Sequence, residues 1–252
     1  MMWLFVSACG LLLQLGVLLQ GLRARLIVKY SFFYAYVFST FLATILAFIL
    51  WKLASASAYQ KGYWIMQFAT LLLGCGIILE IFRHALSPYK GAEKFATAVG
   101  LFTFGGVFCF ALGYRLVVSS PDRALFELER NVRTVQALLL FGIFAVISYY
   151  GIPLGKNIKG MIAGYGLYII TSLFALALRV YAGPRFNSIW NVVQPLSFVG
   201  SFAIWLAALW SFYPNPAPDP AIPLENDYEA LATRTRRTLA SMRSHLTRTA
   251  RS

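Results

Sequence analysis

The chain has 252 residues, of which 59% are hydrophobic and only 12% are charged, and its formal net charge at pH 7 is +13. A water-soluble domain usually carries about 25% charged residues. The composition therefore excludes an ordinary soluble globular protein and predicts a chain buried largely in a membrane.

Seven apolar stretches follow one another along the chain with short gaps between them. A helix needs about 20 apolar residues to cross a hydrocarbon core of about 30 Å, and each stretch is close to that length. Lipid offers no partner to an unpaired backbone group and no stretch alternates like a barrel strand, so all seven should be helices. The sequence predicts an all-α integral membrane protein with a bundle of seven transmembrane helices, at residues 2–21, 31–54, 62–82, 95–119, 132–152, 158–182 and 189–213.

The positions of lysine and arginine predict which way the bundle faces. Most of the 22 basic residues lie in the first, third and fifth connections and in the C-terminal tail. The positive-inside rule places that side in the cytoplasm and the N-terminus outside. We therefore expect a multi-pass membrane protein, with a bundle at residues 1–213, a proline-rich linker at 214–225 and a basic, helix-compatible cytoplasmic tail at 226–252.

Polar residues within the spans are candidates for a ligand site or cavity. In the seventh span Asn191 and Gln194 share a helical face, and Ser197 follows Pro195, which interrupts backbone hydrogen bonding. Gln67 in the third span is a similar candidate. These side chains either line a cavity or form hydrogen bonds between helices.

An acidic residue marks the cytoplasmic end of the third span. Glu80 lies three residues before Arg83 and four before His84, so the three side chains share one helical face. An ionisable residue within a span is a functional candidate because its burial is costly unless it is paired. The alternative is that Glu80 pairs with Arg83 and anchors the end of the helix.

The fifth span is predicted to begin well before its apolar part. Residues 120–122, Ser-Pro-Asp, are a strong helix start, so the helix should run from there into the span. Glu127 with Arg130 and Glu129 with Arg133 are spaced as ion pairs on a solvated helix. This extension is either a plain solvated helix end or an outer docking surface.

The sixth span contains Gly160 and Gly164, which form a GxxxG motif. Small residues at this spacing let helix backbones approach closely, so a helix-packing seam inside the bundle is expected. The motif also occurs on homodimer faces, and the sequence does not predict the oligomeric state.

The tail has a thin apolar stripe, with arginines mostly elsewhere around the helix: Arg234, Arg236, Arg237 and Arg243. Three interpretations compete, namely a helix on anionic lipid, a helix that binds a cytoplasmic or membrane protein partner, and a disordered end. Specific nucleic-acid binding is not expected, because no aromatic residues interleave with the arginines.

Several chemical classes have no support in the sequence. The chain has only two histidines, its three cysteines show no CxxC spacing, and it lacks the HExxH, GxSxG and phosphate-loop motifs. We therefore predict that the protein is not an enzyme and has no catalytic residues, no metal site and no cofactor.

Two segments carry a resemblance: EIFRHALSPY at residues 80–89 and LERNVRTVQ at residues 128–136. Together they resemble a bacterial group of uncharacterised seven-helix membrane proteins, which implies a bacterial inner membrane as the location. The plan, with the N-terminus outside and the C-terminus in the cytoplasm, is also similar to the seven-helix sensor modules of histidine kinases. No catalytic domain follows the seventh span, so a sensor of this plan would pass its signal through a partner or the tail.

These observations leave three hypotheses about function. The first is a sensing or signal-relay protein of the membrane, in which the bundle engages a ligand or partner and the tail is the output. The second is a small permease or channel, and the third is a structural subunit of a membrane complex. A pocket open on one side favours sensing, a continuous polar path favours transport, and a solid core favours the structural role.

Overall fold

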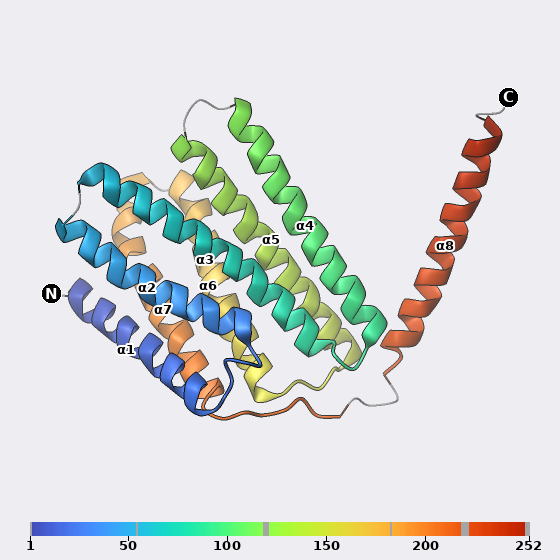
Figure 1. Cartoon of the computed structure of the whole chain (residues 1–252), viewed down its shortest axis with the longest axis horizontal. Helices are drawn as coiled ribbons and strands as arrows, with labels where there is room; N and C mark the ends of the chain where they lie inside the picture. Colours follow the sequence, from blue (N-terminus) through green and yellow to red (C-terminus); the bar gives the residue numbers. More distant parts are fainter. Residues whose placement is uncertain (1, 54, 118–120, 182, 218–221, 250–252) are drawn as a thin grey trace.

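Eight α-helices make up the described part of the chain (Figure 1). The structure is a computed structural model that describes residues 2–53, 55–117, 121–181, 183–217 and 222–249. The helices are α1 Met2–Arg23, α2 Ser31–Leu53, α3 Ala56–Ala85, α4 Lys90–Val117, α5 Pro121–Tyr150, α6 Lys156–Tyr181, α7 Gly183–Ala208 and α8 Leu224–Thr249.

The first seven helices run back and forth between two ends of the bundle. The connections from α1 to α2, α3 to α4, α5 to α6 and α7 to α8 all lie at one end, which we name the basal end (Figure 1). The N-terminus lies at the opposite, distal end. The three connections expected on the cytoplasmic side therefore meet at one end of the molecule, and α8 begins there and runs toward the level of the distal end (Figure 1).

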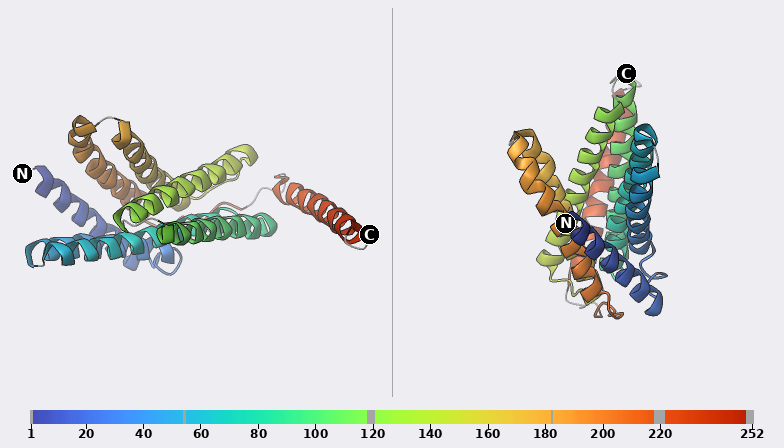
Figure 2. Two further views of the ribbon diagram at one scale, coloured as in Figure 1. Left: turned by 90° about the horizontal axis from the view of Figure 1, so that it is seen from above. Right: turned by 90° about the vertical axis from the view of Figure 1, so that its left-hand side faces the viewer.

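Two close helix pairs form the centre of the bundle, and the remaining helices pack around them. These pairs are α2 with α3 and α6 with α7, while α1 lies against both α2 and α7. Helix α5 contacts α3, α4 and α6, and α4 lies at the edge of the bundle. Helix α8 packs against α4 at its base and then diverges from the bundle (Figures 1 and 2).

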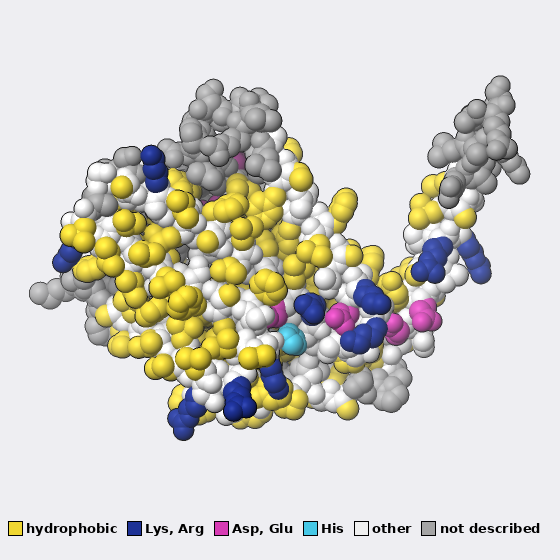
Figure 3. All heavy atoms as spheres, in the orientation of Figure 1, with side chains coloured by type: hydrophobic (Ala, Val, Ile, Leu, Met, Phe, Trp, Pro, Cys, Tyr) yellow, Lys and Arg dark blue, Asp and Glu magenta, His cyan; other side chains and the backbone are white. Residues whose placement is uncertain are grey.

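Five segments of the described chain are long and apolar enough to cross a membrane: Ser31–Leu50, Ala58–Ala85, Lys90–Phe110, Glu127–Tyr150 and Lys156–Ala175. Within the described residues, the apolar parts of α1 and α7 are shorter. Large apolar side chains face outward, and those of Phe102 and Phe141 are 85% and 70% exposed. Figure 3 shows such side chains spread over the bundle, an arrangement consistent with a helical protein embedded in a membrane.

Helix bounds agree with the sequence at some ends and differ at others. The expected start before the fifth span is confirmed, because α5 is one continuous helix from Pro121 to Tyr150. The seventh span was predicted to extend to residue 213, but α7 ends at Ala208. The sequence beyond Ala208 is still apolar and gives no sign of this end. The carbonyl oxygens of Ala208 and Ser211 accept hydrogen bonds from the side chain of Asn157 in α6.

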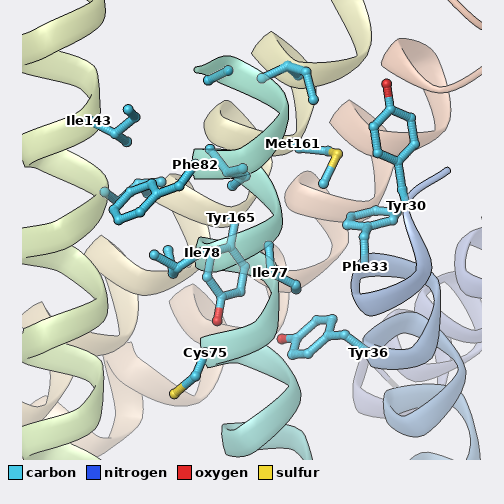
Figure 4. Close-up of a cluster of buried hydrophobic side chains, with 14 of the residues drawn as sticks. Tyr30, Phe33, Tyr36, Cys75, Ile77, Ile78, Phe82, Ile143, Met161 and Tyr165 are labelled. Atoms are coloured by element: carbon cyan, nitrogen blue, oxygen red, sulfur yellow. The ribbon is translucent and has the colours of Figure 1, made fainter. Parts of the chain in front are cut away.

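Aromatic side chains fill the centre of the bundle. The indole of Trp205 contacts the rings of Phe33 and Phe202 edge to face, with centroids 5.0 and 4.8 Å apart. Tyr36 and Tyr165 meet in the same way at 5.8 Å (Figure 4). Each such pair contributes roughly 0.5–1.5 kcal/mol beyond its buried area, so these contacts help to hold α2, α6 and α7 together.

Gly160 and Gly164 lie where α6 meets α7. A Cβ atom at Gly160 would collide with the side chain of Ala208, and one at Gly164 would collide with the indole of Trp205. The small residues therefore allow the close approach of these two helices. The packing seam expected from the GxxxG motif lies between α6 and α7.

Candidate functional site

Glu80 caps the beginning of α2. Its two carboxylate oxygens accept hydrogen bonds from the backbone N–H groups of Phe32 and Phe33, at 3.2 and 2.9 Å. These are first-turn amides, which have no partner within their own helix. The positive end of the helix dipole also favours a carboxylate at this position. Glu80 is therefore a buried link between α3 and α2.

Arg83 and His84 have surroundings different from those of Glu80. The side chain of Arg83 is exposed, and the ion pairs among the described residues do not include a pair between Arg83 and Glu80. The ring of His84 contacts the carbonyl oxygen of Lys29 through Nε2 at 2.9 Å and packs on the Tyr30 ring. Although Glu80 and His84 share one helical face, their side chains therefore contact different groups.

Tyr30 lies just before α2, where its ring contacts that of His84 and Glu80 is nearby. Burial raises the pKa of its hydroxyl to about 12, and the nearby Glu80 carboxylate acts in the same direction. The hydroxyl is protonated at neutral pH, as it would be at the ordinary tyrosine pKa of about 10. This part of the basal end therefore carries no phenolate charge.

Two asparagines fasten the chain that follows α7. The side chain of Asn157 donates to the carbonyl oxygens of Ala208 and Ser211 at 3.1 and 2.8 Å, and it accepts from the N–H of Tyr213. Asn215 donates to the carbonyl oxygen of His84 and accepts from the N–H of Gly155, both at 2.8 Å. The beginning of the proline-rich linker is thus bound to the basal end.

Sequence analysis missed both asparagines. Asn157 stands between Lys156 and Ile158 at the start of α6, and Asn215 stands between two prolines. Their shared property is an amide group that both donates and accepts hydrogen bonds, which suits it to unpaired backbone groups at a helix end. Nothing in the spacing shows which backbone groups they bind.

A buried polar cluster joins α3, α5 and α6 in the distal half of the bundle. The Glu129 carboxylate accepts hydrogen bonds from Gln67 Nε2 at 2.8 Å and from Arg133 Nε at 2.9 Å. The Arg133 guanidinium donates to the Tyr168 hydroxyl at 3.3 Å and lies 5.2 Å from the centre of its ring. Gln67, a predicted cavity residue, therefore belongs to a charged cluster between three helices.

The prediction that both ion pairs on α5 are solvated is wrong for one of them. Arg130 and Glu127 have side chains 45% and 31% exposed, as expected of a solvated pair. The Arg133 side chain is only 8% exposed and faces the bundle. Its position one turn before Gln136, which is also buried, is the sequence signal that could have shown this.

Gln194 and Ser197, the candidates in α7 whose side chains are described, have surroundings different from those of Gln67. Gln194 is exposed, and the hydroxyl of Ser197 donates to the carbonyl oxygen of Gln194 on the same helix at 2.9 Å. The side chain of Asn191 lies outside the described residues, as does that of Arg243. The described polar residues of α7 therefore provide no cavity shared with the cluster.

The base of α8 is bound to the ends of α4 and α5. The carboxylate of Glu225 accepts a hydrogen bond from the N–H of Gly91, in the first turn of α4, at 2.7 Å. The hydroxyl of Tyr150, the last residue of α5, donates to Asp227 at 2.9 Å. The first turns of α8 therefore contact both helices that border its base.

An apolar pocket of about 410 Å³ lies between α3, α4, α5 and the base of α8. A volume of this size is within the range of small-molecule sites. Phe82 of α3 and Ile143 of α5 face each other across it (Figure 4). Side chains from α8 complete its wall: Leu224, Asp227, Tyr228 and Leu231. The pocket suits an apolar molecule or hydrocarbon chain, because nearly all its lining atoms are carbon.

Beyond the pocket, the described side chains of α8 up to Met242 are mostly exposed, and this part of the helix is amphipathic. Leu239 and Met242 are 59% and 56% exposed and continue the stripe that begins with the pocket residues. The exposed residues Arg234, Arg236 and Arg237 lie beside or opposite this stripe. In Figure 3 charged side chains gather mainly along the basal end and the base of α8.

The described side chains include no group of three His, Cys, Asp or Glu residues that could hold a metal ion. The chain matches no protein-family model, no curated protein and no solved structure. The pocket at the base of α8 is therefore the candidate site, on its geometry alone.

Proposed function

We propose that the protein is a non-enzymatic sensing or signal-relay protein of a bacterial inner membrane. One observation carries the proposal: the wall of the apolar pocket is formed partly by the bundle and partly by α8. A molecule in the pocket touches both parts at once, so its presence can change where α8 points. Helix α8 is then the output element for a cytoplasmic or membrane partner.

The proposed topology has seven transmembrane helices, α1 to α7, with the N-terminus outside and the basal end in the cytoplasm. The positive-inside rule supports this orientation, because Arg25, Lys29 and Lys90 lie in basal connections or beside them and α8 carries further arginines. It puts the pocket in the half of the membrane nearest the cytoplasm. A ligand that enters the pocket from that half of the membrane contacts α8 directly, because residues of α8 line the pocket.

The relay requires two arrangements of α8 with different affinity for the pocket ligand. The docked arrangement is held by the bonds of Glu225 and Asp227 to the ends of α4 and α5. Helix α4 lies at the bundle edge, where a ligand can shift it at less cost than a central helix. Movement of α4 carries Gly91, and with it the base of α8.

A permease is supported less well. Transport requires a polar path across the bilayer, yet the core on the basal side of the polar cluster is filled by Ile77, Ile81 and Met161, none of them exposed. Figure 4 labels Ile77 and Met161 among the buried side chains of the core. The polar groups of the distal half therefore do not continue to the basal end in this arrangement.

The test is complementation in the source bacterium after deletion of the gene, read by its transcript profile. Full-length protein should restore the profile, whereas residues 1–217 alone and the double variant Glu225→Ala, Asp227→Ala, which loses both acceptors, should not. Glu229→Ala is the matched control, because Glu229 is an exposed acid of α8. Full complementation by residues 1–217 would show that α8 is not the output and would overturn the proposal.

A further inference from the structure

A strip of aromatic side chains lies at the basal end, where the chain leaves α7 and runs along the base of the bundle (Figure 1). Its members, Trp210, Phe212 and Tyr213, are 59%, 39% and 46% exposed. The side chain of Asn157 fixes this aromatic strip, because it donates to the carbonyl oxygen of Ser211 and accepts from the N–H of Tyr213. The rings are therefore held at the edge of the bundle rather than within a seventh span that continues past Ala208.

Two lysines lie over the aromatic strip. The Nζ atom of Lys29 is 3.1 Å from the centre of the Phe212 ring, and the Nζ atom of Lys156 is 5.4 Å from the centre of the Tyr213 ring. Both lysines are exposed, and the ion pairs among the described residues include neither of them. The ring beneath each ammonium group attracts the positive charge and so favours its position at the basal end.

The surface around these lysines carries positive charge without acids to balance it. Residues 1–79 and 130–218, which supply the basal connections on this side, contain no Asp or Glu. Glu80 is buried and faces the first turn of α2, and Glu93 on α4 is paired with Lys90. Further exposed cations lie in or beside the same connections: Arg23, Arg25 and Lys159. The free charge of this surface therefore suits an anion.

The surface also lies where a membrane would end. Each of the five segments long and apolar enough to cross a membrane has one end at the basal end, at Ser31, Ala85, Lys90, Tyr150 or Lys156. Exposed aromatic side chains at this level are typical of the zone between acyl chains and headgroups. Lipid headgroups are therefore the anions that this surface meets first, whereas an acidic protein would gain little from the exposed rings.

We propose that Lys29, Lys156 and the aromatic strip together bind the headgroups of anionic phospholipids. The rings pack against the upper part of the acyl chains, and the two ammonium groups bind phosphate oxygens. A zwitterionic lipid is disfavoured, because the surface offers no carboxylate to its cationic group. The proposal requires no signal through α8, so it stands apart from the proposed function.

The distal end provides a matched control. The Nζ atom of Lys52 lies 4.9 Å from the centre of the Phe48 ring, so this lysine is also placed over an aromatic side chain. Lys61, near the beginning of α3, is a second exposed lysine at that end. Replacing Lys52 and Lys61 removes the same charge as replacing Lys29 and Lys156 but leaves the basal surface intact.

The experiment is native mass spectrometry of the full-length protein released from nanodiscs that contain equal amounts of phosphatidylglycerol and phosphatidylcholine. The wild type should retain phosphatidylglycerol in preference. The double variant Lys29→Gln, Lys156→Gln should retain about tenfold less of it, because two cations at an anionic surface are lost. Lys52→Gln, Lys61→Gln should match the wild type, and so should Lys29→Arg, Lys156→Arg, because arginine keeps the charge and also stacks on aromatic rings.

A second measurement needs no variant. Raising the ionic strength of the nanodisc buffer should weaken the preference of the wild type for phosphatidylglycerol, because exposed charges are screened by salt. A preference that does not change with ionic strength would show that the ammonium groups do not select the lipid, and it would overturn the proposal.

Three further results would overturn the lipid surface. One is equal retention of the two lipids by the wild type, and another is an equal loss of phosphatidylglycerol from the basal and distal glutamine variants. The third is an acidic protein or nucleic acid that copurifies from native membranes with the wild type and is lost from the basal variant while lipid retention stays the same. Complementation by residues 1–217, which include the whole surface, tests the relay separately.

Discussion

At the scale of single residues, the two ion pairs of α5 show how one sequence pattern can have two environments. Glu127 with Arg130 and Glu129 with Arg133 are both helix-spaced pairs of opposite charge. The first is exposed to solvent, and the second lies within the bundle, where Gln67 and Tyr168 complete its hydrogen bonds. Burial, rather than spacing, decides how much each pair contributes to the free energy of unfolding.

The buried pair predicts a strongly non-additive mutant series. Arg133→Leu should lower the free energy of unfolding by about 3–5 kcal/mol, because it leaves the Glu129 carboxylate without its main partner. The double variant Glu129→Leu, Arg133→Leu should cost less than the sum of the single variants. Reversible unfolding in mixed micelles measures each variant.

The exposed pair is the control for this series. Removing Arg130 or Glu127 should change the free energy of unfolding by less than about 1 kcal/mol, as is usual for exposed ion pairs. Equal coupling energies for the two pairs would contradict the distinction between them.

Glu80 shows what could and could not be predicted at a single position. The sequence correctly marks it as an acid that needs a partner inside a helical bundle. Helical spacing favoured Arg83 as that partner, but the structure provides the N–H groups of Phe32 and Phe33 on another helix. A contact between residues nearly fifty positions apart has no signature in local spacing.

At the scale of elements, the contact of α6 with α7 depends on the absence of side chains. Gly160 and Gly164 are followed by Gly166, which faces another neighbour: a Cβ atom there would lie 3.4 Å from Leu140 Cδ2. The glycines of α6 therefore differ in how far an added methyl group would lower the free energy of unfolding.

This difference predicts opposite effects of two similar substitutions. Gly164→Ala should lower the free energy of unfolding by about 1–3 kcal/mol, because the methyl group forces the Trp205 indole out of place. Gly166→Ala should be neutral or slightly stabilising, because alanine favours helix by about 1 kcal/mol over glycine. Unfolding of both variants under the same conditions gives the comparison, and equal losses would argue against a seam at Gly164.

The helices themselves were the most predictable part of the molecule. Long apolar stretches have few alternatives to helix in a membrane, so each predicted span overlaps one of the helices α1 to α7. The pocket was not predictable, because its lining residues look like ordinary apolar residues in the sequence. Only the arrangement of α4, α5 and α8 makes Phe82, Ile143 and Leu231 neighbours of one space.

At the scale of the whole molecule, the proposed orientation predicts which connections reagents can reach from outside the cell. Val28, between α1 and α2, is 87% exposed at the basal end, and Ser55 is exposed between α2 and α3 at the distal end. In a variant without native cysteines, Ser55→Cys should react with an impermeant maleimide in intact cells. Val28→Cys should react only after the membrane is permeabilised, and the reverse pattern would place the N-terminus in the cytoplasm.

The attachment of Asn215 to His84 and Gly155 has a consequence for any partner of α8. It leaves only a short stretch of chain between a fixed point on the bundle and the first turn of α8. A short tether of this kind gives an effective concentration on the order of millimolar, so α8 rebinds its site far more often than a free helix would. A partner that binds released α8 must therefore compete with the rebinding of α8 to the bundle. Partners of low affinity lose this competition even if no contact disfavours them.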